Sequence, residues 1–246
     1  MKLNKEWLIK IGQLNLDEYK DEGWFKKHNC SYDHSFVDNY EQFKFGIDEG
    51  HFCSINDIGI IVIRGSNSND DWKSNFEFEL ITEKVETKAK VHKGFHAGWK
   101  SIKPYVYDKL EHFQKVIITG HSRGAAIATI AAENLSFDCM SKDIALVPLS
   151  SPMVGNDEFA KLIDRRISDV YRIWYDCDPV VKTPPWECGY RHVHGGIWLH
   201  KNNWLPWRWP LLTISAIGDI TGLPLGYPPD HYPDRVLQAI KDAKDI

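Results

Sequence analysis

Apolar and polar positions along the middle of this chain follow two different periods. Short runs rich in apolar residues at 58–63, 115–120, 143–152 and 169–175 predict strands, and the run at 58–63 is apolar throughout, as expected of a strand covered on both faces. Segments with helical spacing lie between or after them, at residues 96–113, 122–135 and 156–167. Strands that alternate with helices predict an α/β fold, in which a mostly parallel sheet carries helices on both faces.

The flanking regions show weaker patterns. The first forty residues predict an amphipathic helix and then a polar, aromatic segment, and residues 43–47 and 51–55 predict strands. Residues 189–200 predict a hairpin that turns at Gly195–Gly196, and residues 233–246 predict a closing helix with its proline near the start.

The length of the chain suits one large domain. It has 246 residues, of which 43% are hydrophobic, enough for a single core. We therefore expect one domain over 1–246, with a helical and strand lead-in at 1–50 and a Trp- and Pro-rich excursion at 200–229. The net charge of −4 comes with scattered basic residues, so we expect no nucleic-acid partner.

Cysteines and terminal segments bear on the compartment. The five cysteines are odd in number, and no spacing matches a redox motif or a paired metal site, which favours reduced thiols. The first nineteen residues lack the apolar core of a signal peptide, and no run of about eighteen apolar residues predicts a transmembrane helix. We therefore expect a cytoplasmic protein without a transmembrane segment.

Candidate chemistry appears where the strand at 115–120 ends. Ser122 stands in the sequence Gly-His-Ser-Arg-Gly, between a predicted strand and a predicted helix of small residues. This is the pattern of a nucleophile elbow, in which flanking glycines let a strained serine expose its hydroxyl group. An ordinary glycine-rich turn with a serine N-cap is the alternative, but such a turn needs neither glycine at these offsets.

A nucleophilic serine needs a base, and the base needs an acid that fixes its tautomer. Asp178 follows the strand at 169–175 and precedes a stiffening proline, so we favour it as the acid over its competitor Asp176. His231 lies in a loop directly before the last helix, and the order Ser, Asp, His is that of α/β-hydrolases. We therefore expect His231 to be the base.

The other histidines suggest structural roles. His192, His194 and His200 lie in the predicted hairpin, where packed or surface positions are the simpler interpretation. Neither His192 with His194 nor His92 with His96 has a third ligand at a spacing that suits zinc. We expect no metal and no cofactor.

An oxyanion hole needs two backbone N–H donors. The residue after the nucleophile, Arg123, supplies one. The segment after the strand at 58–63 offers the second, because Gly65 permits a tight bend and Ser66 follows it with both an N–H and a hydroxyl. On these residues alone, a polar surface loop is the preferred interpretation of that segment.

Several segments in series resemble the lipase class 3 family, the fungal-type triacylglycerol lipases and their relatives. They are "IVIRGSNSNDDWKSNF", "VHKGFHAGW", "ITGHSRGAAIATIAA", "SSPMVGNDEFA", "YRIWYDCDPVVKTPP", "HVHGGIWLH" and "DHYPDR", in this order between residues 58 and 236. The resemblance implies an α/β-hydrolase fold, a catalytic triad of Ser122, Asp178 and His231, and an oxyanion hole of Ser66 and Arg123.

Two departures from the family bear on the substrate. The position of Arg123 is usually apolar, and a guanidinium beside an acyl pocket would favour a polar or anionic substrate. The segment at 68–80, which resembles the start of a lid, is less apolar than an interfacial lid; its main apolar residues are Trp72, Phe76, Phe78 and Leu80.

The aromatic stretch at 197–231 allows two interpretations. Its tryptophans either complete the core or form the wall of an acyl pocket or a surface that touches lipid transiently, and they are Trp198, Trp204, Trp207 and Trp209.

The sequence thus predicts a serine hydrolase that cleaves carboxylic esters of lipids or small acyl groups. A non-catalytic lipid- or acyl-binding module and an acyltransferase are the alternatives, since both would use the same scaffold.

Overall fold

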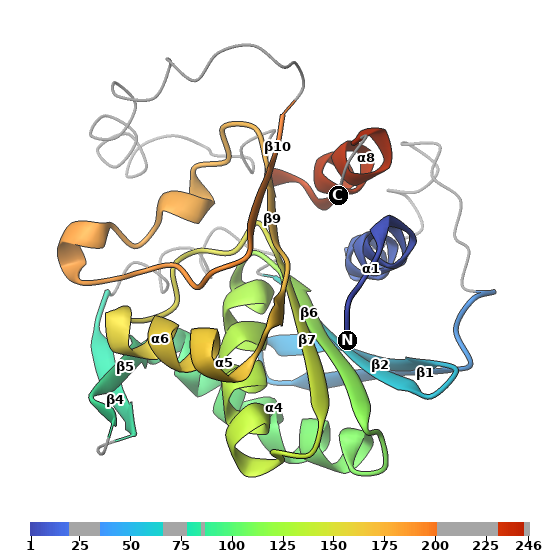
Figure 1. Cartoon of the computed structure of the whole chain (residues 1–246), viewed down its shortest axis with the longest axis horizontal. Helices are drawn as coiled ribbons and strands as arrows, with labels where there is room; N and C mark the ends of the chain where they lie inside the picture. Colours follow the sequence, from blue (N-terminus) through green and yellow to red (C-terminus); the bar gives the residue numbers. More distant parts are fainter. Residues whose placement is uncertain (20–34, 66–77, 85–86, 201–230, 244–246) are drawn as a thin grey trace.

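A mixed sheet of eight strands forms the centre of the computed structural model, which describes residues 1–19, 35–65, 78–84, 87–200 and 231–243 (Figure 1). The strands lie in the order β1-β2-β3-β6-β7-β9-β10, with β8 paired to β7. Their bounds are β1 Asn39–Phe45, β2 Asp48–Ile55, β3 Ile58–Ile63, β6 Lys115–His121, β7 Asp143–Leu149, β8 Asp169–Val170, β9 Arg172–Tyr175 and β10 Gly196–Leu199.

The sheet is parallel where the sequence predicts it to be. β1, β2 and β3 are antiparallel neighbours, and β3, β6, β7, β9 and β10 run parallel to one another. Every residue of β3 is buried, as its unbroken apolar run predicts for a strand covered on both faces. The register pairs Ile63 with Gly120 and His121 with Leu149, so three parallel strands end at the same edge of the sheet.

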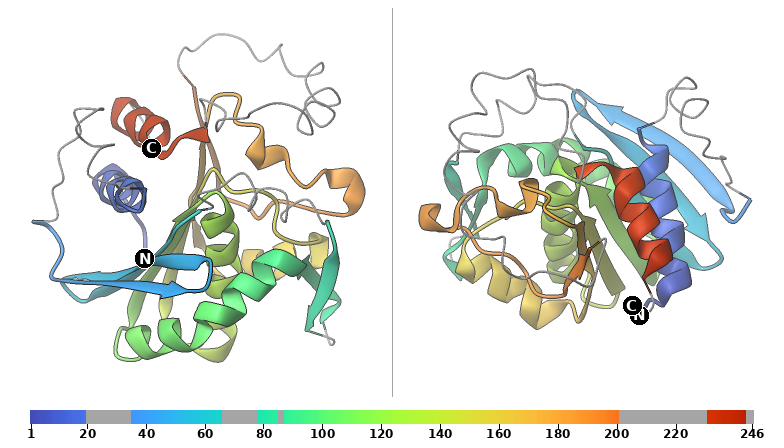
Figure 2. Two further views of the ribbon diagram at one scale, coloured as in Figure 1. Left: turned by 180° about the vertical axis from the view of Figure 1, so that it is seen from behind. Right: turned by 90° about the horizontal axis from the view of Figure 1, so that it is seen from above.

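Helices cover both faces of this sheet, which confirms the predicted α/β architecture. One face carries α4 (Lys93–Leu110), α5 (Arg123–Asp138) and α6 (Asp157–Arg166), and the other carries α1 (Lys5–Asp17) and α8 (Pro233–Asp242). Figure 2 shows α1 and α8 side by side although they lie at opposite ends of the chain. The two faces bury separate apolar clusters, and α5 is buried over most of its length.

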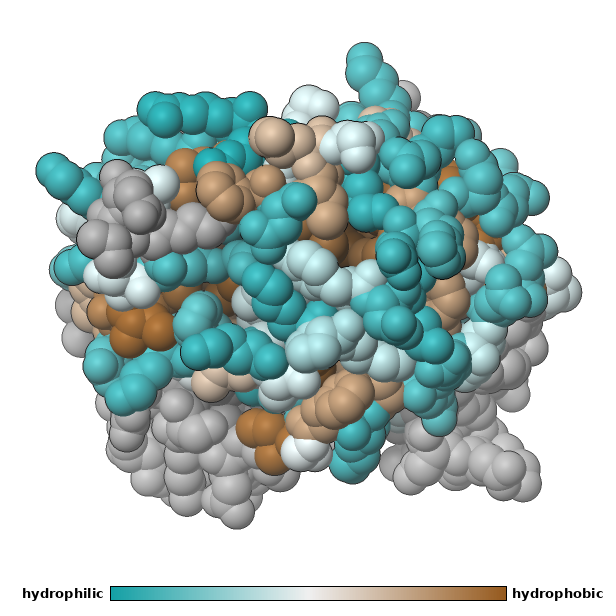
Figure 3. Space-filling view, turned by 90° about the horizontal axis from the view of Figure 1, so that it is seen from below, coloured by the Kyte–Doolittle hydropathy of each residue, from teal (hydrophilic) through white to brown (hydrophobic). Residues whose placement is uncertain are grey.

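Smaller elements surround this centre. A ribbon of β4 (Leu80–Lys84) and β5 (Ala89–His92) lies beside α4 and α6, and two short 3₁₀ helices, η2 (Val180–Lys182) and η3 (Trp186–Cys188), follow β9. The side of the molecule opposite to the carboxyl ends of the parallel strands is mainly hydrophilic, with scattered hydrophobic spots (Figure 3). In the described ranges, no helix has both the length and the hydropathy of a membrane span.

Two local expectations are wrong. The hairpin at 189–200 does not form, because Gly195, with φ of 74°, turns the chain so that β10 pairs parallel to β9. A Cβ at this glycine would lie 2.0 Å from the carbonyl oxygen of Val170, so only glycine fits the turn. Helix α4 starts at Lys93, whereas the sequence pattern predicts a start at residue 96. The earlier start arises because His92 caps the helix by accepting hydrogen bonds from the N–H groups of Gly94 and Phe95.

Candidate active site

Ser122 occupies the sharp turn between β6 and α5. Its backbone has φ of 55° and ψ of −124°, a strained conformation for a residue with a side chain. Its N–H donates to the carbonyl oxygen of Leu149 on the neighbouring strand at 3.0 Å, which holds the turn in place. The structure thus gives Ser122 the backbone that the elbow pattern predicts.

The two glycines of the motif are required by the close packing of the elbow. A Cβ on Gly124 would lie 2.0 Å from the carbonyl oxygen of Ile63, at the end of β3. A Cβ on Gly120 would lie 2.5 Å from the carbonyl carbon of Gly124 and 2.6 Å from the same Ile63 oxygen. The glycines therefore let the first turn of α5 approach β3 directly.

Asp178 and His231 lie together although 53 residues separate them in the chain. The imidazole Nδ1 of His231 lies 2.9 Å from the carboxylate Oδ2 of Asp178, and both side chains are fully buried. The other carboxylate oxygen of Asp178 accepts from the N–H of Val180 at 2.9 Å, which orients the group. The competitor Asp176 lies at a turn with φ of 42°, and its carbonyl accepts from the indole N–H of Trp198.

His121 connects His231 to the elbow. Its ring centroid lies 4.6 Å from that of His231, and its Nε2 lies 2.7 Å from the His231 carbonyl oxygen. His121 directly precedes Ser122, so this bond joins the histidine loop to the serine turn. The hydrogen bonds of the described residues include none between Ser122 and His231 themselves.

The site has donors for a developing negative charge. Arg123 is the first residue of α5, and the N–H groups of a first helical turn have no partner within the helix. The segment after β3 also approaches the serine, because a Cβ on Gly65 would lie 3.1 Å from Ser122 Cβ. The second expected donor, Ser66, lies outside the described residues.

The side chain of Arg123 does not serve the substrate as its sequence position suggests. Its guanidinium forms a buried ion pair with Asp48 of β2, and both side chains are less than a tenth exposed. The second oxygen of Asp48 accepts from the hydroxyl of Ser101 on α4 at 3.0 Å. The expected preference for a polar or anionic substrate therefore loses its basis, because the positive charge is neutralised within the protein.

The three histidines of the segment at 189–200 have structural partners. His192 Nε2 lies 2.6 Å from the carbonyl oxygen of Val181, and burial lowers the pKa of His192 to about 4. His194 Nδ1 lies 2.7 Å from the carboxylate of Asp164 on α6. His200 contacts the ring of Trp198. Among the described residues, no group of three or more potential ligands could hold a metal ion.

Three contributors to this region were not identified from the sequence. His121 was visible inside the elbow motif, but the motif says nothing about what its ring contacts. Tyr19 and Asp48 lie far from Ser122 in the chain and belong to no motif. Only the fold shows that the Tyr19 hydroxyl lies 2.7 Å from His121 Nδ1 and that Asp48 binds Arg123.

The parallel sheet, the strained serine at a strand-to-helix turn and the buried Asp–His pair define the class of protein: an α/β-hydrolase fold. A family model described as lipase (class 3) matches residues 60–188, and the chain belongs to that family. This confirms the resemblance seen in the sequence.

Several relatives resemble the chain over part of their length. A secreted mono- and diacylglycerol lipase 1 from Fusarium solani is 34% identical over 146 residues, which cover 57% of this chain and 43% of the relative. A secreted mono- and diacylglycerol lipase LIP2 from Malassezia restricta is 33% identical over 132 residues, which cover 50% of this chain and 42% of the relative. The matched parts thus span less than half of either relative.

A solved triacylglycerol lipase, described as having a serine protease triad at its catalytic centre, has the same fold. It superposes with a TM-score of 0.68 at 21% sequence identity, covering 82% of this chain and 83% of that one.

The expected cytoplasmic location is wrong. Both relatives are named as secreted lipases, which contradicts that expectation. The cysteines misled because an odd number of thiols describes their pairing and not their compartment. Cys53, for example, is a buried free thiol whose pKa burial raises to about 12, and a buried, unreactive thiol persists in either compartment.

Proposed function

We propose that this protein is a serine hydrolase that cleaves carboxylic ester bonds of lipids through an acyl-enzyme intermediate. The observation that carries the proposal is the buried hydrogen bond between His231 and Asp178, next to the strained elbow of Ser122. A turn with a serine N-cap would require neither the strain nor the pair.

In the proposed reaction, Ser122 Oγ attacks the ester carbonyl while His231 Nε2 takes the hydroxyl proton. The N–H groups of Arg123 and Ser66 stabilise the negative charge on the carbonyl oxygen. Asp178 keeps the proton of the imidazole on Nδ1 and stabilises the imidazolium. His231 then protonates the leaving alcohol. In the second half, His231 takes a proton from the water that attacks the acyl-enzyme and returns it to Ser122 Oγ as the acid leaves.

We propose glycerol esters with one or two acyl chains as the substrates. The names of the relatives from Fusarium solani and Malassezia restricta support this class, and the guanidinium of Arg123 does not select a charged ester because Asp48 neutralises it. We also propose that residues 1–246 act as one domain, and that the protein contacts a lipid surface transiently while its substrate is bound.

The test is hydrolysis by the Ser122→Ala variant. Mono- and diacylglycerol emulsions and a soluble p-nitrophenyl butyrate assay would both be used, with labelling by a fluorophosphonate probe. We expect the variant to lose at least about 10³-fold in turnover and all labelling, because the nucleophile is gone.

Ser136→Ala is the matched control, because its hydroxyl lies on the same helix and donates only to the carbonyl oxygen of Glu133. Its activity should equal that of the wild type. If Ser122→Ala kept wild-type turnover and an unchanged melting temperature, Ser122 would not be the nucleophile.

A further inference from the structure

A hydroxyl group at the end of the first helix lies between two loops of the candidate site. Tyr19 follows α1, and its hydroxyl oxygen lies 3.2 Å from the backbone nitrogen of Gly65 and 2.7 Å from His121 Nδ1. Gly65 directly precedes the expected oxyanion residue Ser66, and His121 directly precedes Ser122. The Tyr19 side chain therefore connects the residue before Ser66 with the residue before Ser122.

The connection continues to the base. His121 Nε2 lies 2.7 Å from the carbonyl oxygen of His231, whose own ring is bonded to Asp178. The contacts thus run from Gly65 through Tyr19 and His121 to His231. They join four segments that are distant in the sequence: the end of α1, the segment after β3, the elbow and the histidine loop.

The hydrogen bonds from Gly65 to His231 allow only one placement of their protons. A carbonyl oxygen can only accept, so His121 Nε2 must carry the proton that it donates to His231. Burial lowers the pKa of His121 well below its ordinary value, so the ring is neutral and Nδ1 is an acceptor. The Tyr19 hydroxyl must then donate to Nδ1, which leaves its oxygen to accept from the N–H of Gly65.

The surroundings leave little room for another arrangement. A Cβ on Gly65 would lie 2.3 Å from the Tyr19 hydroxyl and 2.7 Å from the His121 carbonyl oxygen. The rings of Tyr19 and His121 meet edge to face at 5.3 Å. The guanidinium of Arg64 lies over the Tyr19 ring at 5.4 Å and is itself held by Glu49 at 2.6 Å.

We propose that Tyr19 is a positioning residue whose hydroxyl fixes the segment before Ser66 and, through the neutral His121 ring, the main chain of His231. Its role is to set the distance between the oxyanion donors, the nucleophile and the base. This proposal rests on the proposed function, because a site without turnover would need no such alignment. Tyr19 itself touches neither the substrate nor the reacting atoms.

The experiment compares Tyr19→Phe with Tyr107→Phe. Both remove one hydroxyl, but that of Tyr107 bonds to Asp138, the last residue of α5, at the end of the helix opposite to the elbow. We expect Tyr19→Phe to lower kcat for p-nitrophenyl butyrate about tenfold with KM changed less than twofold, since alignment acts on the transition state. Tyr107→Phe should keep the wild-type kcat. Equal kcat values for the two variants would overturn the proposal.

A second readout does not depend on turnover. Nitrogen-15 NMR of the histidine rings should show His121 neutral, with Nε2 protonated and Nδ1 accepting, and Tyr19→Phe should change the Nδ1 shift selectively. Protonation of Nδ1 in the wild type would contradict the arrangement. If the wild-type protein did not react with the fluorophosphonate probe, the proposed function itself would be overturned. The failure of the Tyr19 proposal can therefore be distinguished from the failure of the proposed function.

Discussion

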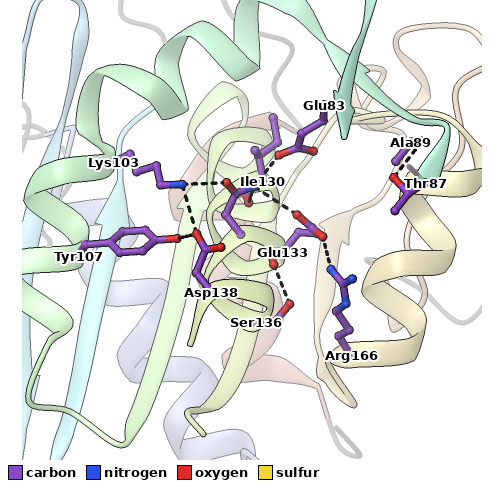
Figure 4. Close-up of polar contacts among 11 residues, drawn as sticks. Glu83, Thr87, Ala89, Lys103, Tyr107, Ile130, Glu133, Ser136, Asp138 and Arg166 are labelled. Carbon is purple, nitrogen blue, oxygen red and sulfur yellow. Dashed lines mark hydrogen bonds and ion pairs between the residues drawn. The ribbon is translucent and has the colours of Figure 1, made fainter. Parts of the chain in front are cut away.

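The two ends of helix α5 each carry an ion pair, and the two pairs differ in their exposure to water. At its start, Arg123 pairs with Asp48 where the side chains are 8% and 6% exposed. At its end, Asp138 pairs with Lys103 of α4 where the side chains are 36% and 37% exposed (Figure 4). The same kind of ion pair thus lies inside the protein at one end and in contact with water at the other.

A third ion pair, of intermediate exposure, lies between the two ends of the helix. Glu133 is fully buried, but its partner Arg166 on α6 is a quarter exposed, and Asn134 adds a hydrogen bond from its amide at 3.2 Å. Figure 4 shows these groups between α5 and its neighbouring elements, with Glu83 reaching in from β4. The comparison teaches that burial of both partners decides how much a change at either end should cost.

The largest effect is expected from crowding the start of the helix. In Gly124→Ala the new methyl group meets the carbonyl oxygen of Ile63 at 2.0 Å, and backbone atoms cannot rotate away. We expect a loss of more than about 5 kcal/mol in the free energy of unfolding, or no folded protein. Urea denaturation followed by circular dichroism measures it.

Gly94→Ala is the control for this change, because its nearest neighbour would be a side-chain atom of His92 at 3.2 Å. It should lose less than about 1 kcal/mol, since the helix gains an alanine. Equal stability of Gly124→Ala and the wild type would show that the elbow is not packed as described.

The second effect concerns the buried pair at the same end. Asp48→Ala leaves the Arg123 guanidinium buried without its carboxylate, and we expect a loss of about 3–5 kcal/mol in the free energy of unfolding. The double variant Asp48→Leu with Arg123→Leu should recover most of this loss, because it removes both charges. Thermal melting of the three proteins measures the recovery.

Turnover sharpens this test. The double variant should keep ester hydrolysis within about threefold of the wild type, because the expected oxyanion donor at position 123 is the backbone N–H, which every residue except proline retains. A double variant that folds well but loses turnover would assign a catalytic role to the guanidinium itself.

The sequence predicted the start of helix α5 better than the contacts of that helix with distant segments. The strand, the glycine spacing and the serine are local features, so the elbow between β6 and α5 could be recognised from a few residues. The order of Asp178 and His231 along the chain also suggested their pairing, and the fold brings these two side chains together.

Contacts between distant segments were beyond the sequence pattern. Nothing near Asp48 indicates that it faces Arg123, because that contact depends on how β2 and α4 pack against α5. The hairpin at 189–200 failed for a similar reason, since β10 gains its hydrogen bonds from β9 and not from the residues just before it. A single local pattern cannot show which distant strand lies alongside.

The smallest effect is expected at the exposed end of α5. Asp138→Asn keeps the size of the side chain and can still accept from the Tyr107 hydroxyl, which lies 2.5 Å from Asp138 Oδ2. Lys103 loses an ion pair at 3.3 Å in which water already solvates both partners. We expect a change below about 0.5 kcal/mol in the free energy of unfolding, measured by urea denaturation at low and at high salt. A loss as large as that of Asp48→Ala would contradict the comparison, because burial would then not be what separates the two ends of the helix.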